Sequence, residues 1–382
     1  MRSPTTAGRI VLEPGRRNPA VEEFSAKLRS KIVGQDEAVS QLVNIYEMII
    51  AGMTIPGRPI ANLLFLGPTG SGKTRIIEAA AEILCGNPKS FIKVDCGEFQ
   101  HSHEISKLIG SPPGYIGHRE TPVVLNQEAI DQFHTDSLKL TFVLFDEIEK
   151  SSDALWQLLL GVLDRGTLTM GDNHKVDFSR TVVVMTSNLG AEQMSRLARG
   201  GIGFTSREPE DSVRQTDKRM ESVAVVAARQ HFSPEFMNRL DRVVVFHGLS
   251  PAQLSEILDI ELTQVQDRIQ ALSPTHGFKF NCTPETKAFL IREGTDAKYG
   301  ARPLKRAIER HVVLPLARLL STMQITSGDT VTVDIVPGKT EMVFLKEESV
   351  ARLPEPQPQD CDDELWAYYA SAYIAHSSVS QN

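Results

Sequence analysis

The chain has 382 residues, of which 41% are hydrophobic and 23% are charged, and its net charge is −7 at pH 7. This length predicts two or three domains, and the composition is typical of a globular protein, which excludes wholesale disorder, a collagen-like repeat and a disulfide-stapled mini-protein. The sequence contains no run of 18 apolar residues, so no membrane span is predicted, and no apolar leader that would predict secretion. Its negative net charge disfavours a general nucleic-acid binder.

Residues 1–20 contain several arginines and prolines and are expected to form a mobile arm. Helices are expected over 21–30 and 35–51. Nearly continuous runs of Val, Ile, Leu and Phe then alternate with helical patterns, and these runs are Ala61–Leu66, Phe91–Asp95, Thr141–Phe145, Thr181–Thr186 and Val243–Phe246. Because such runs are typical of strands buried on both faces, residues 21–248 are expected to form an α/β domain, a parallel five-stranded sheet with helices on both faces.

The pattern changes after residue 248. A long amphipathic helix is expected over 251–271, and shorter helices over 284–293 and 301–320. Short β runs are expected at Phe278–Asn281, Thr330–Val336 and Glu341–Lys346. We therefore expect a small mixed α/β lid domain over 249–346, followed by an acidic and aromatic tail over 347–382.

A phosphate-binding loop follows the first predicted strand and precedes a helix expected over Arg75–Leu84. It fits the pattern G-x-x-x-x-G-K-[ST] and consists of Gly67, Pro68, Thr69, Gly70, Ser71, Gly72, Lys73 and Thr74. Its glycines let main-chain N–H groups surround phosphate oxygens at a helix N-terminus. Lys73 is expected to reach the β and γ phosphates of ATP, and the Thr74 hydroxyl is expected to bind Mg²⁺. The alternative is a merely flexible glycine loop.

Two acids, Asp146 and Glu147, end the third apolar run. Ligands of open α/β sheets bind at the carboxyl ends of strands. Asp146 is expected to hold Mg²⁺ through water, and Glu147 to polarise the attacking water, so that ATP is hydrolysed and not only bound. Asn188 follows the next strand and can orient that water, although a plain turn explains it equally well.

Eight ordered blocks of this sequence resemble the AAA+ ATPases, and most closely the last ATPase module of the Clp protein unfoldases (ClpA, ClpB and ClpC), over residues 21–345. The blocks are Ile32–Val39, the phosphate loop, Gly114–Gly117, Leu144–Lys150, Val176–Phe178, Met185–Ala191, Phe232–Asp241 and Tyr299–Arg306.

The resemblance implies roles for further residues. Ile32 and Val33 would line the adenine pocket, Asn188 would be sensor 1, Arg239 would be an arginine finger directed at the neighbouring subunit, and Arg302 would be sensor 2. Both arginines suit stabilisation of the transferring phosphoryl group. Without the resemblance, a solvated surface arginine and an ordinary basic helix face would explain Arg239 and Arg302.

Two loops receive roles from the same resemblance. Tyr115 and Ile116, on a glycine-flanked loop, would line a central pore and grip a substrate chain without reading its sequence. Ile202, Gly203 and Phe204 would form a docking loop for a ClpP-type peptidase. The alternatives are a tyrosine packed on its own domain and an irregular loop.

Together with the resemblance, the sequence predicts an ATPase that uses ATP and Mg²⁺. It is expected to assemble as a homo-oligomeric ring of six subunits, because a trans arginine finger needs a neighbour. Unfolded or misfolded proteins are the expected substrates, threaded through the pore. The alternative is a nucleotide-gated scaffold that does not thread. Four cysteines, without a C-x-x-C pair, favour a reducing cytoplasm. The tail, with Trp366, Tyr369 and Tyr373 at helical spacing, is expected to dock on its own lid or on a partner.

Overall fold

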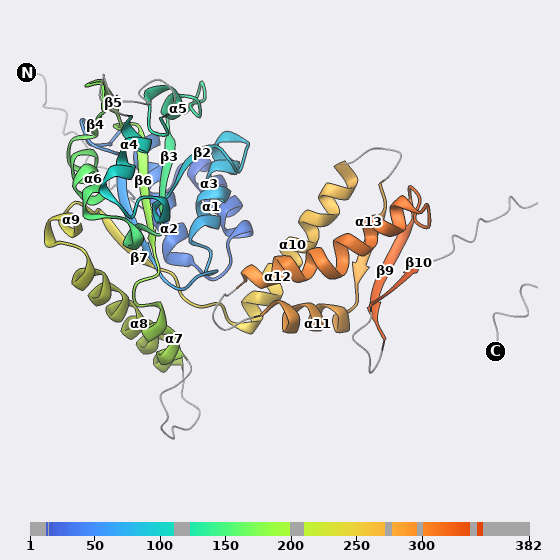
Figure 1. The fold of residues 1–382 in the computed structure, drawn as a ribbon. Coiled ribbons are helices and arrows are strands. Elements are labelled where there is room, and N and C mark those ends of the chain that lie inside the picture. Colours follow the sequence, from blue (N-terminus) through green and yellow to red (C-terminus); the bar gives the residue numbers. More distant parts are fainter. Residues whose placement is uncertain are drawn as a thin grey trace, which may run out of the picture.

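A parallel sheet organises the first two thirds of the chain, and helices cover both of its faces (Figure 1). The structure is a computed structural model that describes residue 13 and residues 15–110, 123–198, 210–271, 277–295, 301–336 and 342–346. Among these residues the main sheet has five strands in the order β2-β3-β6-β1-β7, all parallel. Its strands are β1 (Ala61–Leu66), β2 (Phe91–Asp95), β3 (Thr141–Asp146), β6 (Thr181–Ser187) and β7 (Arg242–Val245). The predicted fold class is confirmed.

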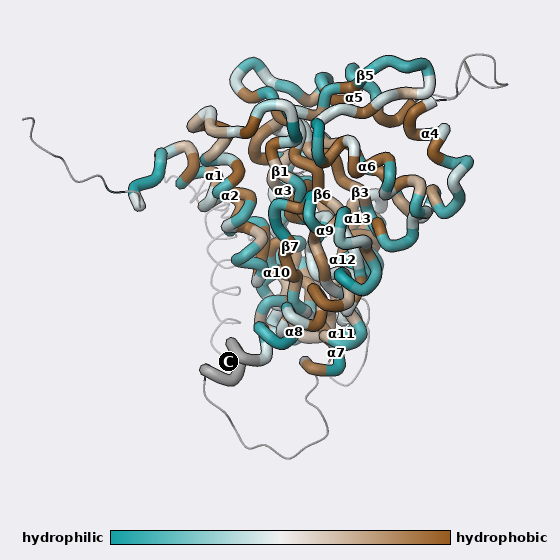
Figure 2. The backbone as a smooth tube through the Cα atoms, turned by 90° about the vertical axis from the view of Figure 1, so that its left-hand side faces the viewer, coloured by the Kyte–Doolittle hydropathy of each residue, from teal (hydrophilic) through white to brown (hydrophobic). Residues whose placement is uncertain are grey.

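The central strands are apolar because both of their faces are covered. In β1, Leu63 and Phe65 point to one core cluster, whereas Leu64 and Leu66 point to the other, as the two-residue period of a strand requires. Figure 2 shows this apolar centre as brown strands inside more hydrophilic helices. Helices α1 (Pro19–Lys31), α2 (Asp36–Ile50) and α3 (Lys73–Cys85) supply one cluster, and α6 (Asp153–Arg165), α8 (Glu210–His231) and α9 (Pro234–Asn238) supply the other.

Shorter elements complete this part of the chain. A two-stranded antiparallel hairpin, which the sequence analysis missed, follows α6. The elements are β4 (Thr167–Thr169), β5 (Lys175–Asp177), α4 (Ser106–Ile109), α5 (Gln127–Asp131) and α7 (Ala191–Ala198).

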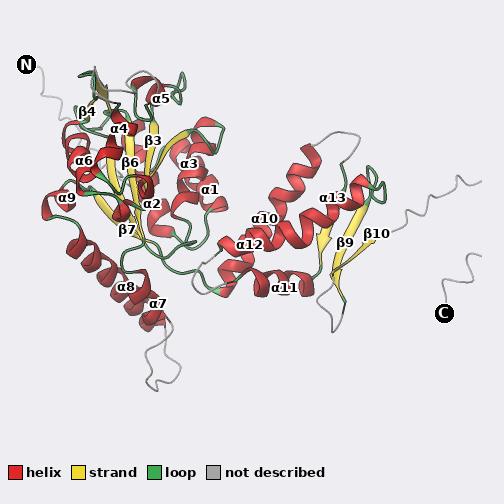
Figure 3. Cartoon of the chain, in the orientation of Figure 1, coloured by secondary structure: helices red, strands yellow, loops and turns green. Residues whose placement is uncertain are grey.

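The second part of the chain has its own core and lies beside the first (Figures 1 and 3). A three-stranded sheet in the order β10-β9-β8 packs with helices, so the mixed α/β composition is confirmed. Its elements are α10 (Pro251–Ala271), β8 (Lys279–Cys282), α11 (Pro284–Gly294), α12 (Arg302–Ile308), α13 (Leu314–Ser321), β9 (Thr330–Ile335) and β10 (Met342–Lys346).

The helix predicted over 301–320 is divided by a π-helical segment, Glu309–Val313. Pro315 explains this difference, because it has no N–H to donate to the carbonyl one turn back and its ring displaces that carbonyl.

Among the residues that the structure describes, no helix combines the length and the apolar character that a membrane span requires.

Candidate active site

The phosphate loop has the backbone conformation that its glycines permit. It connects β1 to α3, and Gly67, Gly70 and Gly72 all have positive φ, with values of +146°, +78° and +102°. A Cβ atom at Gly67 would lie 2.3 Å from the carbonyl oxygen of Phe246, so only glycine fits there. The loop therefore passes close to the backbone that follows β7 and opens at the N-terminus of α3.

Lys73 is buried at the start of α3, and its Nζ is held inside the loop. It donates to the carbonyl oxygens of Gly67 at 2.7 Å and Pro68 at 2.9 Å, and to Oδ1 of Asn188 at 2.9 Å. Burial, the largest influence, lowers the pKa of Lys73 to about 8, although nearby carboxylates favour its charged form. Phosphate oxygens are a stronger ligand for this ammonium than two carbonyls, and so the loop is arranged for an anion.

Asp146 ends β3 beside the loop, and both of its carboxylate oxygens have partners. Lys93 Nζ lies 2.7 Å from Oδ2, and the Thr186 hydroxyl donates to Oδ1. Burial alone would raise the pKa of Asp146, but the hydrogen bonds from Lys93 and Thr186, together with the positive charges of Lys93 and Lys73, hold the pKa below its ordinary value. The carboxylate is therefore anionic, as a ligand for a hard divalent cation must be.

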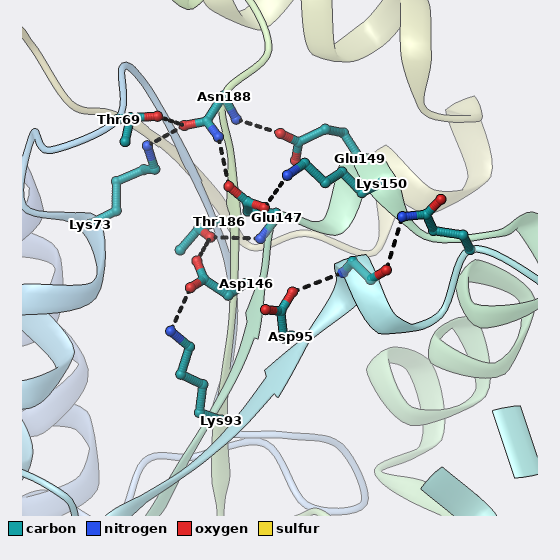
Figure 4. A network of polar contacts seen from close by, with 12 residues as sticks. Thr69, Lys73, Lys93, Asp95, Asp146, Glu147, Glu149, Lys150, Thr186 and Asn188 are labelled. Atoms are coloured by element: carbon teal, nitrogen blue, oxygen red, sulfur yellow. Dashed lines mark hydrogen bonds and ion pairs between the residues drawn. The ribbon is translucent and has the colours of Figure 1, made fainter. Parts of the chain in front are cut away.

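Glu147 has a left-handed backbone conformation, with φ of +58°. Its N–H donates to the Thr186 hydroxyl at 3.1 Å, its Oε1 lies 3.5 Å from Nδ2 of Asn188, and its Oε2 accepts from Lys150. Asn188 therefore joins Lys73 to Glu147 through the two ends of one amide (Figure 4). Three residues predicted from separate motifs converge at one point.

Sequence reasoning missed several residues of this site, among them Glu149 and Gln35. Glu149 accepts a hydrogen bond from the N–H of Asn188 at 3.0 Å, so it fixes the residue that joins the two halves (Figure 4). Gln35 is buried, and its Nε2 donates to the carbonyls of Ser71 and His247, both at 3.0 Å. Both residues lie in segments that carried the family resemblance, but only the fold showed what they contact.

A cleft of about 350 Å³ extends from the phosphate loop to the small domain. Ile32 and Val33 line it, and Thr74, Asp146 and Glu147 line its polar end. The small domain contributes Arg302 at the N-terminus of α12, and apolar residues that the sequence analysis did not name, Leu249, Ile257 and Ile260, complete the lining. An apolar end and an anion-binding end suit a nucleotide.

Arg239 does not line this cleft. It is the C-cap residue of α9, in the turn before β7. Its Nη1 lies 3.4 Å from Oδ1 of Asp164, and its side chain is 39% exposed. Within one subunit the structure therefore brings together Lys73, Asp146, Glu147, Asn188 and Arg302, and leaves Arg239 apart.

The remaining predicted residues lie outside the described part of the chain. These are the pore-loop residues Tyr115 and Ile116, the docking-loop residues Ile202, Gly203 and Phe204, and the tail over 347–382.

Two family models match consecutive parts of the chain. The AAA domain (Cdc48 subfamily) matches residues 58–243, and the C-terminal D2-small domain of ClpB protein matches residues 249–333. The first match includes β1, β2, β3 and β6 of the main sheet, and the second runs from just before α10 into β9.

Curated relatives and solved structures are similar over most of this chain. The chain is 36% identical to the chaperone protein ClpB 1 of Nostoc sp. over 82% of its length, which is 33% of that protein. It is 37% identical to a ClpA homolog of Pyropia yezoensis, an ATP-binding subunit of the ATP-dependent Clp protease, over 84% of its length and 37% of that protein. The Saccharomyces cerevisiae Hsp104:casein complex in its extended conformation superposes with a TM-score of 0.72 at 31% identity, covering 87% of this chain and 53% of that one. The chain thus spans about a third of the length of the curated relatives that it matches.

Proposed function

The chain belongs to the Clp type of AAA+ ATPases, and on that premise we propose that it hydrolyses ATP in a ring of six copies to unfold or remodel protein substrates. The observation that carries the proposal is the contact of Asn188 with both Lys73 and Glu147. One amide there links the group that binds the terminal phosphates to the group that activates water, so phosphate binding and hydrolysis share one site.

The residues of the cleft divide the chemistry among them. Lys73 and the N–H groups of the loop bind the β and γ phosphates, and Glu147 accepts the proton of the attacking water. Asn188 orients that water. Arg302 is the first residue of α12 and lines the cleft, so it couples the position of the small domain to the state of the nucleotide. Ile32 and Val33 contact the base.

Magnesium fits the same cleft. The anionic Asp146 and the Thr74 hydroxyl lie on its lining and would hold the cation, Asp146 partly through water. Bound there, the cation would neutralise charge on the phosphate oxygens as the phosphoryl group transfers.

Arg239 completes the site of a neighbouring subunit in this proposal. It lies outside its own cleft, and its guanidinium is partly exposed. A head-to-tail contact that repeats and closes generates a ring, and an arginine supplied in trans stabilises the charge of the transition state.

Two observations support protein as the substrate, namely the similar chaperones and the sequence pattern of the pore loop. The Hsp104 structure named above is a complex with casein. We infer that Tyr115 and Ile116 grip an extended chain by apolar contact, which tolerates many sequences. The scaffold alternative predicts the same ring and ATPase without unfolding.

The test uses the purified chain with ATP, magnesium and fluorescent casein. A ring of about six subunits that hydrolyses ATP faster when casein is present supports the proposal. Nucleotide binding without hydrolysis contradicts the assigned chemistry, whereas hydrolysis and a ring without any response to casein favour the scaffold.

A peptidase partner is a separate proposal for the segment Ile202–Phe204. Two apolar side chains around a glycine suit insertion into the pocket of a ClpP-type peptidase ring. Capture of such a peptidase on immobilised protein, lost in Phe204→Ala, supports this partnership, and capture that is unchanged in the variant contradicts it.

A further inference from the structure

Asn62 is a fully buried amide in an otherwise apolar strand, β1. Its Nδ2 donates to two main-chain carbonyls from different parts of the chain, Leu163 at 3.0 Å and Arg239 at 3.1 Å. Its Oδ1 is buried and has no hydrogen-bond partner among the described residues. Burying an amide oxygen without a hydrogen-bond partner costs free energy, and an apolar residue at this position of the strand would avoid that cost. The presence of Asn62 therefore needs an explanation, and its two donated hydrogen bonds suggest one.

The main chain of Asn62 fixes the same turn. Its N–H donates to Oδ2 of Asp241 at 2.7 Å, and its carbonyl accepts from the N–H of Asp241 at 2.9 Å. Arg58 forms an ion pair with the other carboxylate oxygen of Asp241. The turn that carries Arg239 is therefore attached to β1 on both sides of Leu240.

The two acceptors of the Asn62 side chain both belong to the surroundings of one guanidinium. Arg239 carries it, and Leu163 precedes Asp164, whose Oδ1 lies 3.4 Å from Nη1 of Arg239. The Nε of Arg239 is buried without an acceptor among the described residues, so few other contacts fix this side chain. One amide thus sets both the backbone from which the guanidinium extends and the backbone of the carboxylate that orients it.

Asn62 is remote from the nucleotide cleft of its own subunit. It is the second residue of β1 and does not line the cleft. At about 3.3 Å per residue, it lies roughly 13 Å before Leu66, the last residue of β1, after which the phosphate loop begins. A change at Asn62 should therefore leave the phosphate loop of that subunit in place.

We propose that Asn62 is a positioning residue for Arg239 and acts on hydrolysis in the neighbouring subunit rather than in its own. This inference rests on the proposed trans role of Arg239. Misplacing a catalytic group by about 1 Å costs on the order of 100-fold in rate, so loss of the amide should lower kcat and spare nucleotide affinity.

The variants are Asn62→Ala, which removes both donated bonds, and Asn62→Ser, which is milder because its hydroxyl can still donate one. Thr141→Val is the matched control, since it also removes one buried side-chain hydrogen bond from a strand of the same sheet, to Ile130, without touching the turn of Arg239. We expect kcat to fall about 10- to 100-fold in Asn62→Ala and less in Asn62→Ser, with affinity for a fluorescent ATP analogue within twofold of the unchanged protein. Thr141→Val should retain kcat.

Mixed rings decide which subunit carries the defect. Asn62→Ala subunits mixed with Glu147→Gln subunits should regain hydrolysis, because the variant's intact cleft then meets an intact Arg239. Mixed with Arg239→Ala subunits they should not regain it, since both partners lack a positioned guanidinium. A defect in the variant's own cleft predicts the opposite pattern and overturns the inference, as does a normal kcat in both Asn62 variants.

A control mixture separates this inference from the function on which it rests. If Arg239→Ala and Glu147→Gln subunits do not restore each other, the trans role of Arg239 is wrong and the positioning role falls with it. If they do and Asn62→Ala behaves as a cleft mutant, only the inference about Asn62 is wrong. If Asn62→Ala does not fold, by circular dichroism and size exclusion, the same mixtures with Asn62→Ser give the answer.

Discussion

The ammonium of Lys73 and the side-chain oxygen of Asn188 lie 2.9 Å apart, although 115 residues separate them in the chain. Asn188 directly follows β6, which pairs with β1, and the phosphate loop directly follows β1. Parallel neighbours end at the same edge of a sheet, so the loop and Asn188 must meet there. The order of the strands therefore places Lys73 next to Asn188, which in turn contacts Glu147.

Glu147→Gln should bind ATP and hydrolyse it at least about tenfold more slowly, because the amide cannot accept a proton while the phosphate loop is unchanged. The measurements are phosphate release and binding of a fluorescent ATP analogue. Glu192→Gln, in an exposed pair with Arg196 on α7, is the matched control and should retain turnover. Near-normal hydrolysis in Glu147→Gln would refute its role.

Nucleotide affinity should fall at alkaline pH because burial lowers the pKa of Lys73 to about 8. Below that pH the free protein already carries the ammonium. Above it, binding must take up a proton, since phosphate favours the charged form. ADP affinity without magnesium should therefore drop about tenfold between pH 7 and pH 9.

The matched variant for this pH dependence is Lys73→Arg, whose guanidinium stays charged throughout. Its ADP affinity should be flat over the same range, even if it is weaker. Calorimetry in buffers of different ionisation enthalpy should detect proton uptake at pH 9 only in the unchanged protein. Identical pH profiles for the two proteins would contradict the assignment to Lys73.

Arg239→Ala should retain ATP binding and lose most hydrolysis, because its guanidinium lies outside its own cleft. Arginine fingers elsewhere contribute about 10³–10⁵ in rate. Hydrolysis should return when these subunits are mixed with Glu147→Gln subunits, at interfaces that pair an intact Glu147 with an intact Arg239. Full activity of Arg239→Ala, or of a preparation shown to be monomeric by light scattering, is incompatible with a trans finger.

Tyr115→Ala should hydrolyse ATP at the basal rate but fail to unfold a tagged fluorescent protein, since the aromatic contact with the substrate is lost. Tyr115→Phe retains the ring and should retain unfolding. The readouts are phosphate release and loss of the native fluorescence. Unfolding that persists in Tyr115→Ala would favour the scaffold alternative.

Deletion of residues 354–382 should leave ATP binding intact and change either ring assembly or partner capture. In the tail sequence Trp366, Tyr369 and Tyr373 recur at helical spacing, and because an isolated short helix is marginal in water, these side chains are expected to need a docking surface. Size-exclusion and pull-down profiles identical to those of the full chain would leave the tail without this role.

Local sequence patterns were sufficient for much of the fold and for the nucleotide-binding motifs. The five apolar runs became the five strands because continuous Val, Ile, Leu and Phe suit a position buried on both faces. The phosphate loop was predictable because its conformation depends on glycines within eight residues. The break at Glu309–Val313 was missed, although Pro315 was a visible signal for it.

What the sequence by itself determined were interactions between near neighbours in the chain. It indicated that Asp146 and Glu147 end a strand, and that Lys73 opens a helix. Only the tertiary structure decided that Asn188 joins Lys73 to Glu147, that Glu149 fixes Asn188, and that Asn62 holds the turn of Arg239. The reason is physical, because these contacts depend on strand order and on side-chain direction across the sheet, and a linear pattern encodes neither.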